Sequence, residues 1–162
     1  MEVFGDENLI MMGQVLLAAF LGVLVGAERE LARKPAGMRT YALVSMGACI
    51  FTIISIFAGR MSGMILGTPD DAFTDVSRIA AQVVVGIGFI GAGMAIFQGT
   101  KVRGLTTAAG VWVSAAIGMA IGFRMYSIAI FTTFVVLLIF VFLWQLEVRI
   151  VKRYASEPPE DV

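Results

Sequence analysis

Apolar residues occur along the chain in five long runs, and the charged residues gather between them. Each run is free of charge and has about the 20 residues with which a helix crosses the hydrocarbon layer of a membrane. Inside lipid every backbone N–H and C=O needs a partner within the protein, which a helix supplies by itself. The pattern predicts an all-α integral membrane protein with five transmembrane helices, at about 9–26, 41–58, 79–97, 105–122 and 126–144.

The basic residues between the runs are distributed unevenly, and this distribution predicts the orientation. Lysines and arginines in short loops favour the cytoplasmic side. We therefore expect the N-terminus outside and the C-terminus in the cytoplasm. Residues 1–146 form the membrane domain in this prediction, residues 147–162 a short polar cytoplasmic tail, and the outer loop 59–78 no long helix because of its glycines and proline. The predicted inner side carries Arg29, Arg33, Lys34, Arg39, Lys101, Arg103, Arg149, Lys152 and Arg153, and the outer side only Arg60, Arg78 and Arg124.

Composition agrees with this class and excludes several functions. Apolar residues make up 59% of the chain and charged residues 15%, too few to cover a soluble core of this size. The net charge of zero gives no reason to expect nucleic acid as a partner. The chain has no histidine and a single cysteine, Cys49, in an apolar run, so we expect no enzyme, no metal site and no cofactor.

The third run contains the sequence GIGFIGAG, in which Gly86, Gly88 and Gly91 match the fingerprint of a dinucleotide-binding turn. Such a turn needs a strand before it and an acidic residue about 20 positions later. Residues 98–146 contain no acid, and the glycines fall inside a continuous apolar span. The pattern instead favours close packing of membrane helices through small residues. The predicted helix-packing glycines are Gly22, Gly26, Gly86, Gly91 and Gly93.

Asp75, Arg78 and Gln82 precede these glycines at helical spacing and share one stripe with Gly86. Polar side chains at membrane depth are costly and normally face a bundle interior or water. The stripe is therefore a candidate functional face. A structural interpretation stays open for its outer end, where Asp75 caps the helix and Arg78 reaches to the headgroups.

The segment between the first two runs is a second candidate region. A solvated group of charges is the ordinary interpretation of such a loop. Arg39, however, opens the second helix, where its charge opposes the helix dipole and calls for a partner. Glu28 or Glu30, at the end of the first helix, is the economical choice. The fourth helix, rich in small residues, is expected at the centre of the bundle, and the bulky fifth at its periphery.

Four ordered stretches resemble the motifs of the MgtC/SapB family of bacterial inner-membrane proteins: GAERE, GMRTYALVSMGA, RIAAQVVVGIGFIGAGM and VRGLTTAAGVWVSAAIG. The resemblance covers about residues 9–144, and we expect a short form that lacks the soluble C-terminal domain of the family's virulence-associated type. By position the family's polar pattern falls on a candidate network of Glu28, Arg29, Arg39, Thr40, Asp75, Arg78, Gln82, Arg103, Thr106 and Thr107.

The resemblance implies a bacterial inner-membrane protein associated with growth under magnesium limitation and, in pathogens, with survival inside macrophages. It implies a non-enzymatic regulator, because the virulence-associated type is implicated in inhibition of the F-type ATP synthase and in membrane potential. Besides the lipid bilayer, the expected partners are a second copy in a homodimer and another membrane protein complex such as that synthase. The alternative is a transporter or channel for a small ion or solute that uses Asp75, Arg78 and Gln82. Magnesium suits that path poorly, because the spans carry no carboxylate.

Overall fold

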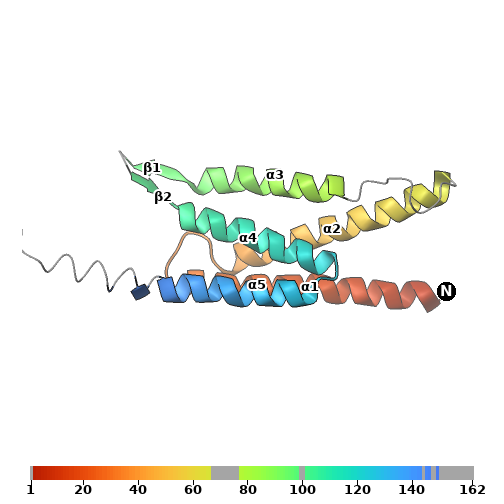
Figure 1. The fold of residues 1–162 in the computed structure, drawn as a ribbon, viewed down its shortest axis with the longest axis horizontal. Helices are drawn as coiled ribbons and strands as arrows, with labels where there is room; N and C mark the ends of the chain where they lie inside the picture. Colours follow the sequence, from red (N-terminus) through yellow and green to blue (C-terminus); the bar gives the residue numbers. More distant parts are fainter. Residues whose placement is uncertain (1, 67–76, 99–100, 144, 147–148, 150–162) are drawn as a thin grey trace, which may run out of the picture.

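The fold is a bundle of helices in which successive helices run in opposite directions (Figure 1). The computed structural model describes residues 2–66, 77–98, 101–143, 145–146 and 149. Within these residues the predicted all-α membrane class is confirmed. The elements are α1 (Glu2–Leu31), α2 (Met38–Leu66), α3 (Ser77–Met94), β1 (Ile96–Gln98), β2 (Lys101–Arg103), α4 (Leu105–Gly122), α5 (Tyr126–Leu138) and the π-helix η1 (Ile139–Leu143).

Helix lengths agree with the membrane prediction, with differences at two ends. In the described residues four helices are long and apolar enough to span a bilayer, and the apolar part of α3, Arg78–Met94, is shorter. The predicted third span reached residue 97, whereas Ile96 already pairs with Arg103 in an antiparallel hairpin. Hydropathy cannot separate a short apolar strand from the last turn of a helix. The prediction of no long helix after residue 58 was also wrong for α2, since a formed helix extends through glycine at a small cost per residue.

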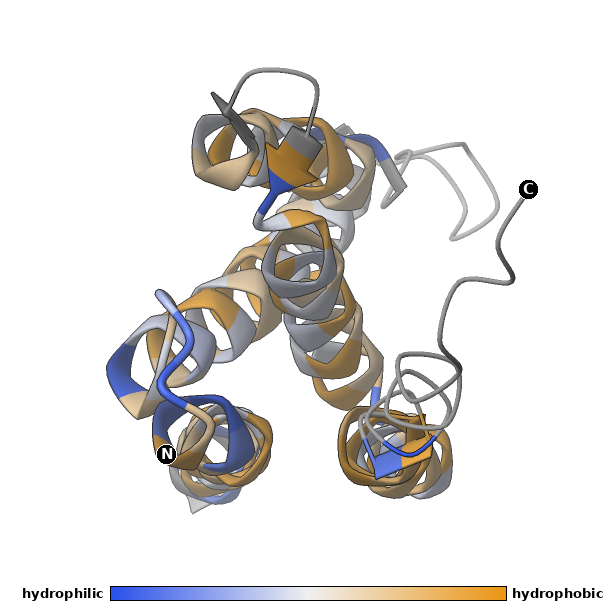
Figure 2. Ribbon diagram, turned by 90° about the vertical axis from the view of Figure 1, so that its left-hand side faces the viewer, coloured by the Kyte–Doolittle hydropathy of each residue, from blue (hydrophilic) through white to orange (hydrophobic). Residues whose placement is uncertain are grey.

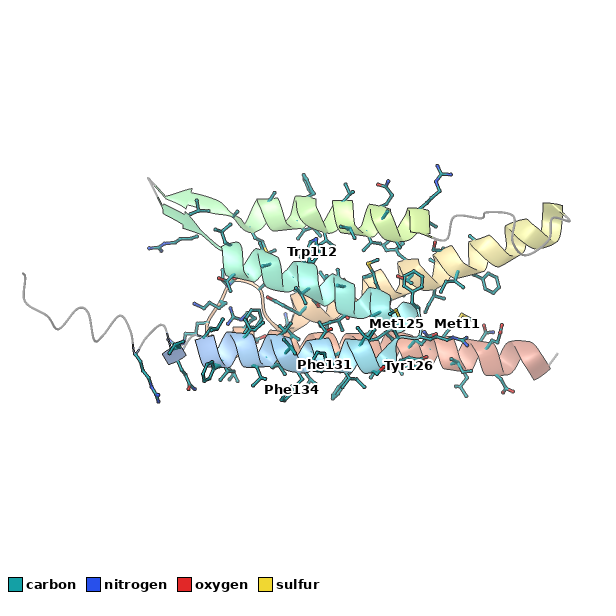
Figure 3. All side chains as sticks on the ribbon, viewed as in Figure 1. Met11, Trp112, Met125, Tyr126, Phe131 and Phe134 are labelled. Atoms are coloured by element: carbon teal, nitrogen blue, oxygen red, sulfur yellow. The ribbon has the colours of Figure 1, made fainter. Side chains whose placement is uncertain are left out.

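Helix α4 lies in the middle of the group, as its small residues predicted, and contacts the other four helices (Figure 2). Its side chains are short enough for neighbouring backbones to approach on several sides. Helix α5 lies further out, and its aromatic side chains Phe131 and Phe134 are 67% and 59% exposed (Figure 3). In a membrane this exposed apolar surface faces lipid, which costs nothing.

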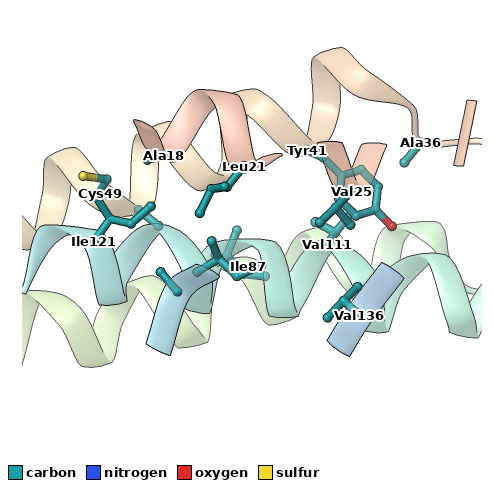
Figure 4. Packing of buried hydrophobic residues seen from close by; sticks show 14 of the residues in the cluster. Ala18, Leu21, Val25, Ala36, Tyr41, Cys49, Ile87, Val111, Ile121 and Val136 are labelled. Atoms are coloured by element: carbon teal, nitrogen blue, oxygen red, sulfur yellow. The ribbon is translucent and has the colours of Figure 1, made fainter. Parts of the chain in front are cut away.

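The core lies where α1, α2 and α4 meet (Figure 4). Tyr41 of α2 is fully buried beside Val25 of α1 and Val111 of α4. Two polar groups of the core bond to the backbone of a neighbouring helix: Ser114 Oγ donates to the Tyr41 carbonyl at 3.0 Å, and Tyr41 Oη to the Thr107 carbonyl at 3.4 Å. These bonds join α2 to α4 at a depth where unpaired polar groups are expensive.

Three glycines bring the core helices into backbone contact. A Cβ on Gly26 of α1 would lie 2.6 Å from Met38 Cα of α2, and one on Gly22 would lie 2.6 Å from the Tyr41 carbonyl oxygen. On α4, a Cβ on Gly118 would overlap the Ser45 carbonyl of α2. Close approach of this kind replaces the hydrophobic drive that helices lack in lipid. The α1–α2–α4 group is therefore the rigid centre of the molecule.

Because the helices alternate in direction, three segments lie at the same end of the bundle: the loop 32–37, the β1–β2 hairpin and the end of η1 (Figure 1). Arg29, Lys34 and Arg103 belong to this end, which we call the basic end. The N-terminus of α1 and Arg124 lie at the other end. The basic loops thus lie at one end, as the charge distribution predicts, and the location of this end in the cytoplasm stays a prediction. Asp75 and the tail after residue 149 lie outside the described residues.

Candidate functional site

A pocket of about 550 Å³ opens at the basic end, between the end of α1, the start of α4 and the end of α5. Two segments far apart in the sequence supply cations to it: the end of α1 with the loop after it supplies Arg29 and Lys34, and β2 supplies Arg103. Thr106 and Thr107 add hydroxyl groups, and Ile139, Phe140 and Leu143 form an apolar wall. We call this the basic pocket. It brings together four residues of the predicted polar network, Arg29, Arg103, Thr106 and Thr107.

Arg29 is the innermost cation of the basic pocket and is only 4% exposed. Its Nε donates to Glu28 Oε2 at 2.5 Å and its Nη2 to Glu28 Oε1 at 3.0 Å. The guanidinium also stacks on Phe140, with Cζ 3.8 Å from the ring centroid. A two-point ion pair and a cation–π contact hold the group in one orientation. Nη1 takes part in neither bond to Glu28.

The start of α4 forms one side of the basic pocket, and Gly104 makes this geometry accessible. Gly104 has φ of 89°, in the left-handed region that glycine enters without strain, and a Cβ there would overlap the Met94 carbonyl. The chain thus turns from β2 directly into α4. No side chain caps the helix, so its first backbone N–H groups are free of intrahelical partners beside Thr106 and Thr107.

The π-helix η1 places Phe140 in the basic pocket. A π-turn changes the register of a helix by one residue, and such turns are frequent at functional sites. Phe140 is 7% exposed and lies under Arg29. Sequence reasoning missed this residue, because nothing in an apolar run marks where a helix widens. It also missed Lys34 as a pocket residue, although Lys34 lies in the same loop as the predicted group.

The remaining members of the predicted network on α1 and α2 have other surroundings. Glu30 Oε2 accepts the Met38 backbone N–H at 3.0 Å, and Glu28 is paired with Arg29. Within the described residues Arg39 makes no ion pair and its side chain is exposed. The expected bond from Arg39 to Glu28 or Glu30 is therefore absent there, because a nearer donor occupies each carboxylate. Thr40 is partly buried one residue later and does not line the basic pocket.

A second hollow, of about 460 Å³, runs between α2 and α3. Its lining is apolar apart from Gln82 and includes Gly47 of α2 and Gly86 of α3. We call it the α3 groove. The predicted stripe lies along it in part: Gln82 lines the groove, Arg78 is exposed at the start of α3, and Asp75 is not described.

The predicted packing glycines separate into two groups. Gly22 and Gly26 meet α2 backbone, as given above, whereas Gly86 and Gly93 have no atom within 4 Å of a built Cβ. Gly91 lies between these extremes, with the Ala108 side chain at 3.7 Å from its built Cβ. None of the described residues therefore covers the α3 face that contains Gly86 and Gly93.

Gln14 of α1 is a buried polar residue that sequence reasoning did not select. Its side-chain nitrogen donates to the Ile121 carbonyl at 2.5 Å and to the Gly122 carbonyl at 3.3 Å. These carbonyls belong to the last turn of α4, where helix carbonyls lack their usual i+4 donors, and Ile121 also accepts the Arg124 backbone N–H at 2.9 Å. The sequence did indicate a role for Gln14, because an amide within an apolar run needs a hydrogen-bond partner at membrane depth. Its role is structural, because it binds α1 to the end of α4.

The side chains that the structure describes contain no group of three histidine, cysteine, aspartate or glutamate residues that could hold a metal ion. The carboxylate nearest the basic pocket, that of Glu28, is engaged by Arg29. The chemistry of this site, with three cations around a cavity, suits an anion and repels Mg²⁺.

Comparison with known proteins gives one consistent result. Residues 15–149 match the MgtC family. The "Putative magnesium transporter YhiD" of Escherichia coli K12 is 42% identical over 140 residues, 86% of this chain and 63% of that protein. An uncharacterized protein of Haemophilus influenzae is 41% identical over 135 residues, 83% of this chain and 56% of that protein.

A third relative is the protein MgtC of Salmonella typhimurium LT2, which is 40% identical over 135 residues, 82% of this chain and 53% of that protein. The chain thus spans less than two thirds of the length of these relatives. No solved structure matches it.

Proposed function

The chain belongs to the MgtC family and is a multi-pass protein of the bacterial inner membrane, and from this premise we propose that it is a non-enzymatic regulator of another membrane protein. The names of its relatives connect the family with magnesium. In this proposal the protein acts during growth under magnesium limitation and, in a pathogen, during intracellular survival. It does so by binding its target within the membrane.

One observation carries the proposal: the α3 groove is a largely apolar hollow of about 460 Å³ that none of the described helices fills. Gly47 and Gly86 have no side chains and so leave the groove deep enough for a second backbone to approach, and Gln82 offers an amide at membrane depth. An exposed glutamine costs free energy in lipid but bonds well to a polar group on a second helix. A glycine-lined groove beside such an amide supports the docking of a transmembrane helix.

The occupant that we propose is a transmembrane helix of a target complex, with the F-type ATP synthase as the first candidate from the family resemblance. Binding there lets the protein inhibit the synthase and so alter membrane potential. Occupation of the groove by a second copy is the competing assignment and is distinguished by the experiment below. The transport alternative has less support, since Arg78 and Gln82 lie on the outside of the single chain.

Site-specific crosslinking in native membranes tests this proposal. A photoreactive amino acid replaces Phe51, which lines the α3 groove, and a control probe replaces Phe131 on the lipid side of α5. We expect the Phe51 probe to crosslink a membrane subunit of the ATP synthase and the Phe131 probe to crosslink none. Gly86→Leu fills the groove and abolishes the crosslink, while Gly13→Leu, at an equally open glycine of α1, leaves it intact.

Function is followed in the same respiring membranes by ATP synthesis and membrane potential. Wild type lowers ATP synthesis and raises the potential, because fewer protons return through the inhibited synthase, and Gly86→Leu reverses both effects. Crosslinks only between copies of the chain would assign the α3 groove to a homodimer and contradict the proposed target. Flux of Mg²⁺ or another ion through proteoliposomes of the pure protein would instead establish the transporter. Neither experiment depends on what binds in the basic pocket.

A further inference from the structure

The basic pocket and the α3 groove are separate surfaces, and the basic pocket has a ligand chemistry of its own. Its walls carry Arg29, Lys34 and Arg103 against one neighbouring carboxylate, Glu28, which is bound to Arg29. Of the described acids nearby, Glu30 is bonded to the Met38 N–H and does not line the pocket. Among the described side chains, three cations against one anion leave an excess of two positive charges, so the pocket attracts an anion.

Burial of Arg29 strengthens this attraction. Arg29 is 4% exposed, so its guanidinium has lost most of its hydration. The Glu28 carboxylate and the Phe140 ring compensate for that loss on only two sides of the group. Glu28 and Phe140 also fix the group, so little conformational entropy is lost when an anion arrives. The pocket is therefore built around an oriented donor, with Lys34 and Arg103 at its rim.

The donors surround the cavity from several directions. Besides the three cations there are the hydroxyls of Thr106 and Thr107 and the uncapped N-terminus of α4, whose dipole favours negative charge. A single carboxylate has too few oxygens for so many donors, whereas a phosphate group presents acceptors on all sides. The geometry points to a phosphate group as the ligand of the basic pocket.

The depth of the pocket in the membrane indicates where such a phosphate comes from. The candidate spans Asp6–Leu31 and Tyr126–Leu143 end here, and Leu105–Gly122 begins here, which is the level of lipid headgroups. Ile139 and Leu143 continue the pocket as an apolar wall on which an acyl chain can lie. An anionic lipid headgroup and a free phosphate share the required chemistry, and the test separates them.

The test compares two double variants with equal change of charge. Lys34→Gln/Arg103→Gln removes two cations that line the pocket, and Arg33→Gln/Arg39→Gln removes two exposed cations of the same end that do not. All four side chains are exposed, so both variants keep the fold. Each purified protein is delipidated in detergent and offered phosphatidylglycerol or phosphatidylcholine, with bound lipid counted by native mass spectrometry. In phosphate-free buffer, inorganic phosphate is added separately and the Tm is followed.

We expect wild type and the Arg33→Gln/Arg39→Gln control to retain phosphatidylglycerol over phosphatidylcholine. Loss of two charge-assisted contacts lowers that affinity at least about tenfold in Lys34→Gln/Arg103→Gln. A Tm that rises with inorganic phosphate, without preference for the anionic lipid, supports the free phosphate as the source. The proposal is overturned if Lys34→Gln/Arg103→Gln binds as well as wild type. It is also overturned if wild type neither prefers phosphatidylglycerol over phosphatidylcholine nor gains Tm with inorganic phosphate.

Discussion

Gly118 of α4 and Gly86 of α3 are glycines of neighbouring helices, yet their surroundings are opposite. A Cβ on Gly118 would overlap the Ser45 carbonyl, whereas one on Gly86 would touch nothing within 4 Å. The same residue type therefore serves two purposes in this molecule. On α1 and α4 glycine closes the fold, and on α3 it leaves a face of the fold open. Because the closed face is already packed against α2 within the chain, the proposed recognition of another protein falls to the open one.

The largest effect is expected where a glycine meets backbone. Gly118→Ala forces α4 away from the Ser45 carbonyl, which belongs to the backbone and cannot rotate aside, and we expect it to lower the free energy of unfolding by about 3 kcal/mol. Reversible denaturation in mixed detergent measures the change. Gly13→Ala, at a glycine with nothing within 4 Å, is the control. Equal stability of the two variants would show that the α2–α4 contact is looser than described.

A smaller loss is expected at the α1–α2 contact. Gly26→Ala places a methyl group 2.6 Å from Met38 Cα, at the first turn of α2, which can shift more easily than its middle. We expect about 2 kcal/mol of destabilisation in the same assay. Basic-pocket lipid binding should fall with it, because α1 carries Arg29. If Gly26→Ala is destabilised but binds lipid as wild type does, lipid binding in the basic pocket does not depend on the α1–α2 contact.

The two glutamines extend the comparison from glycine to polar side chains. Gln14→Leu removes donors from the Ile121 and Gly122 carbonyls, and we expect a loss of about 1 kcal/mol, in the range of hydrogen bonds between membrane helices. Gln82→Leu, on the open face, should leave the stability of the isolated chain intact or raise it. Thermal unfolding of both in detergent is the measurement. A greater loss from Gln82→Leu would mean that its amide already has a partner.

The smallest effect is expected on the open face itself. Gly86→Ala adds a methyl group where there is room, so stability of the isolated chain should change by no more than about 0.5 kcal/mol. Crosslinking from the Phe51 probe should nevertheless weaken, since the groove becomes shallower. Strong destabilisation by Gly86→Ala in detergent would indicate that a second copy already covers this face.

Much of the fold was available from local pattern. The apolar runs predicted the five helices, the small residues of α4 predicted its central place, and four motifs identified the family that the comparisons confirmed. The errors lie at the ends of elements, where β1 replaces the last turn predicted for the third span and α2 continues to Leu66. There a few apolar or glycine residues fit more than one structure, and contacts with other segments decide.

The candidate site was less accessible to such reasoning. Arg29, Arg103, Thr106 and Thr107 were selected from family position, but their convergence on one pocket depends on the packing of α1 against α4. Phe140 and Lys34 also line that pocket, and no sequence pattern singles them out as pocket residues. Gln14 did carry a mark, as a lone amide in an apolar run, and its partners on α4 lie more than a hundred residues away.

The sequence by itself determined that this chain spans a membrane, how its helices alternate and on which end its basic loops gather. Those properties follow from hydropathy and charge, which act on each segment separately. Only the tertiary structure decided which glycines are covered and which cations share a pocket. A glycine or an arginine has the same local properties in either setting, and its role depends on which helix faces pack against one another.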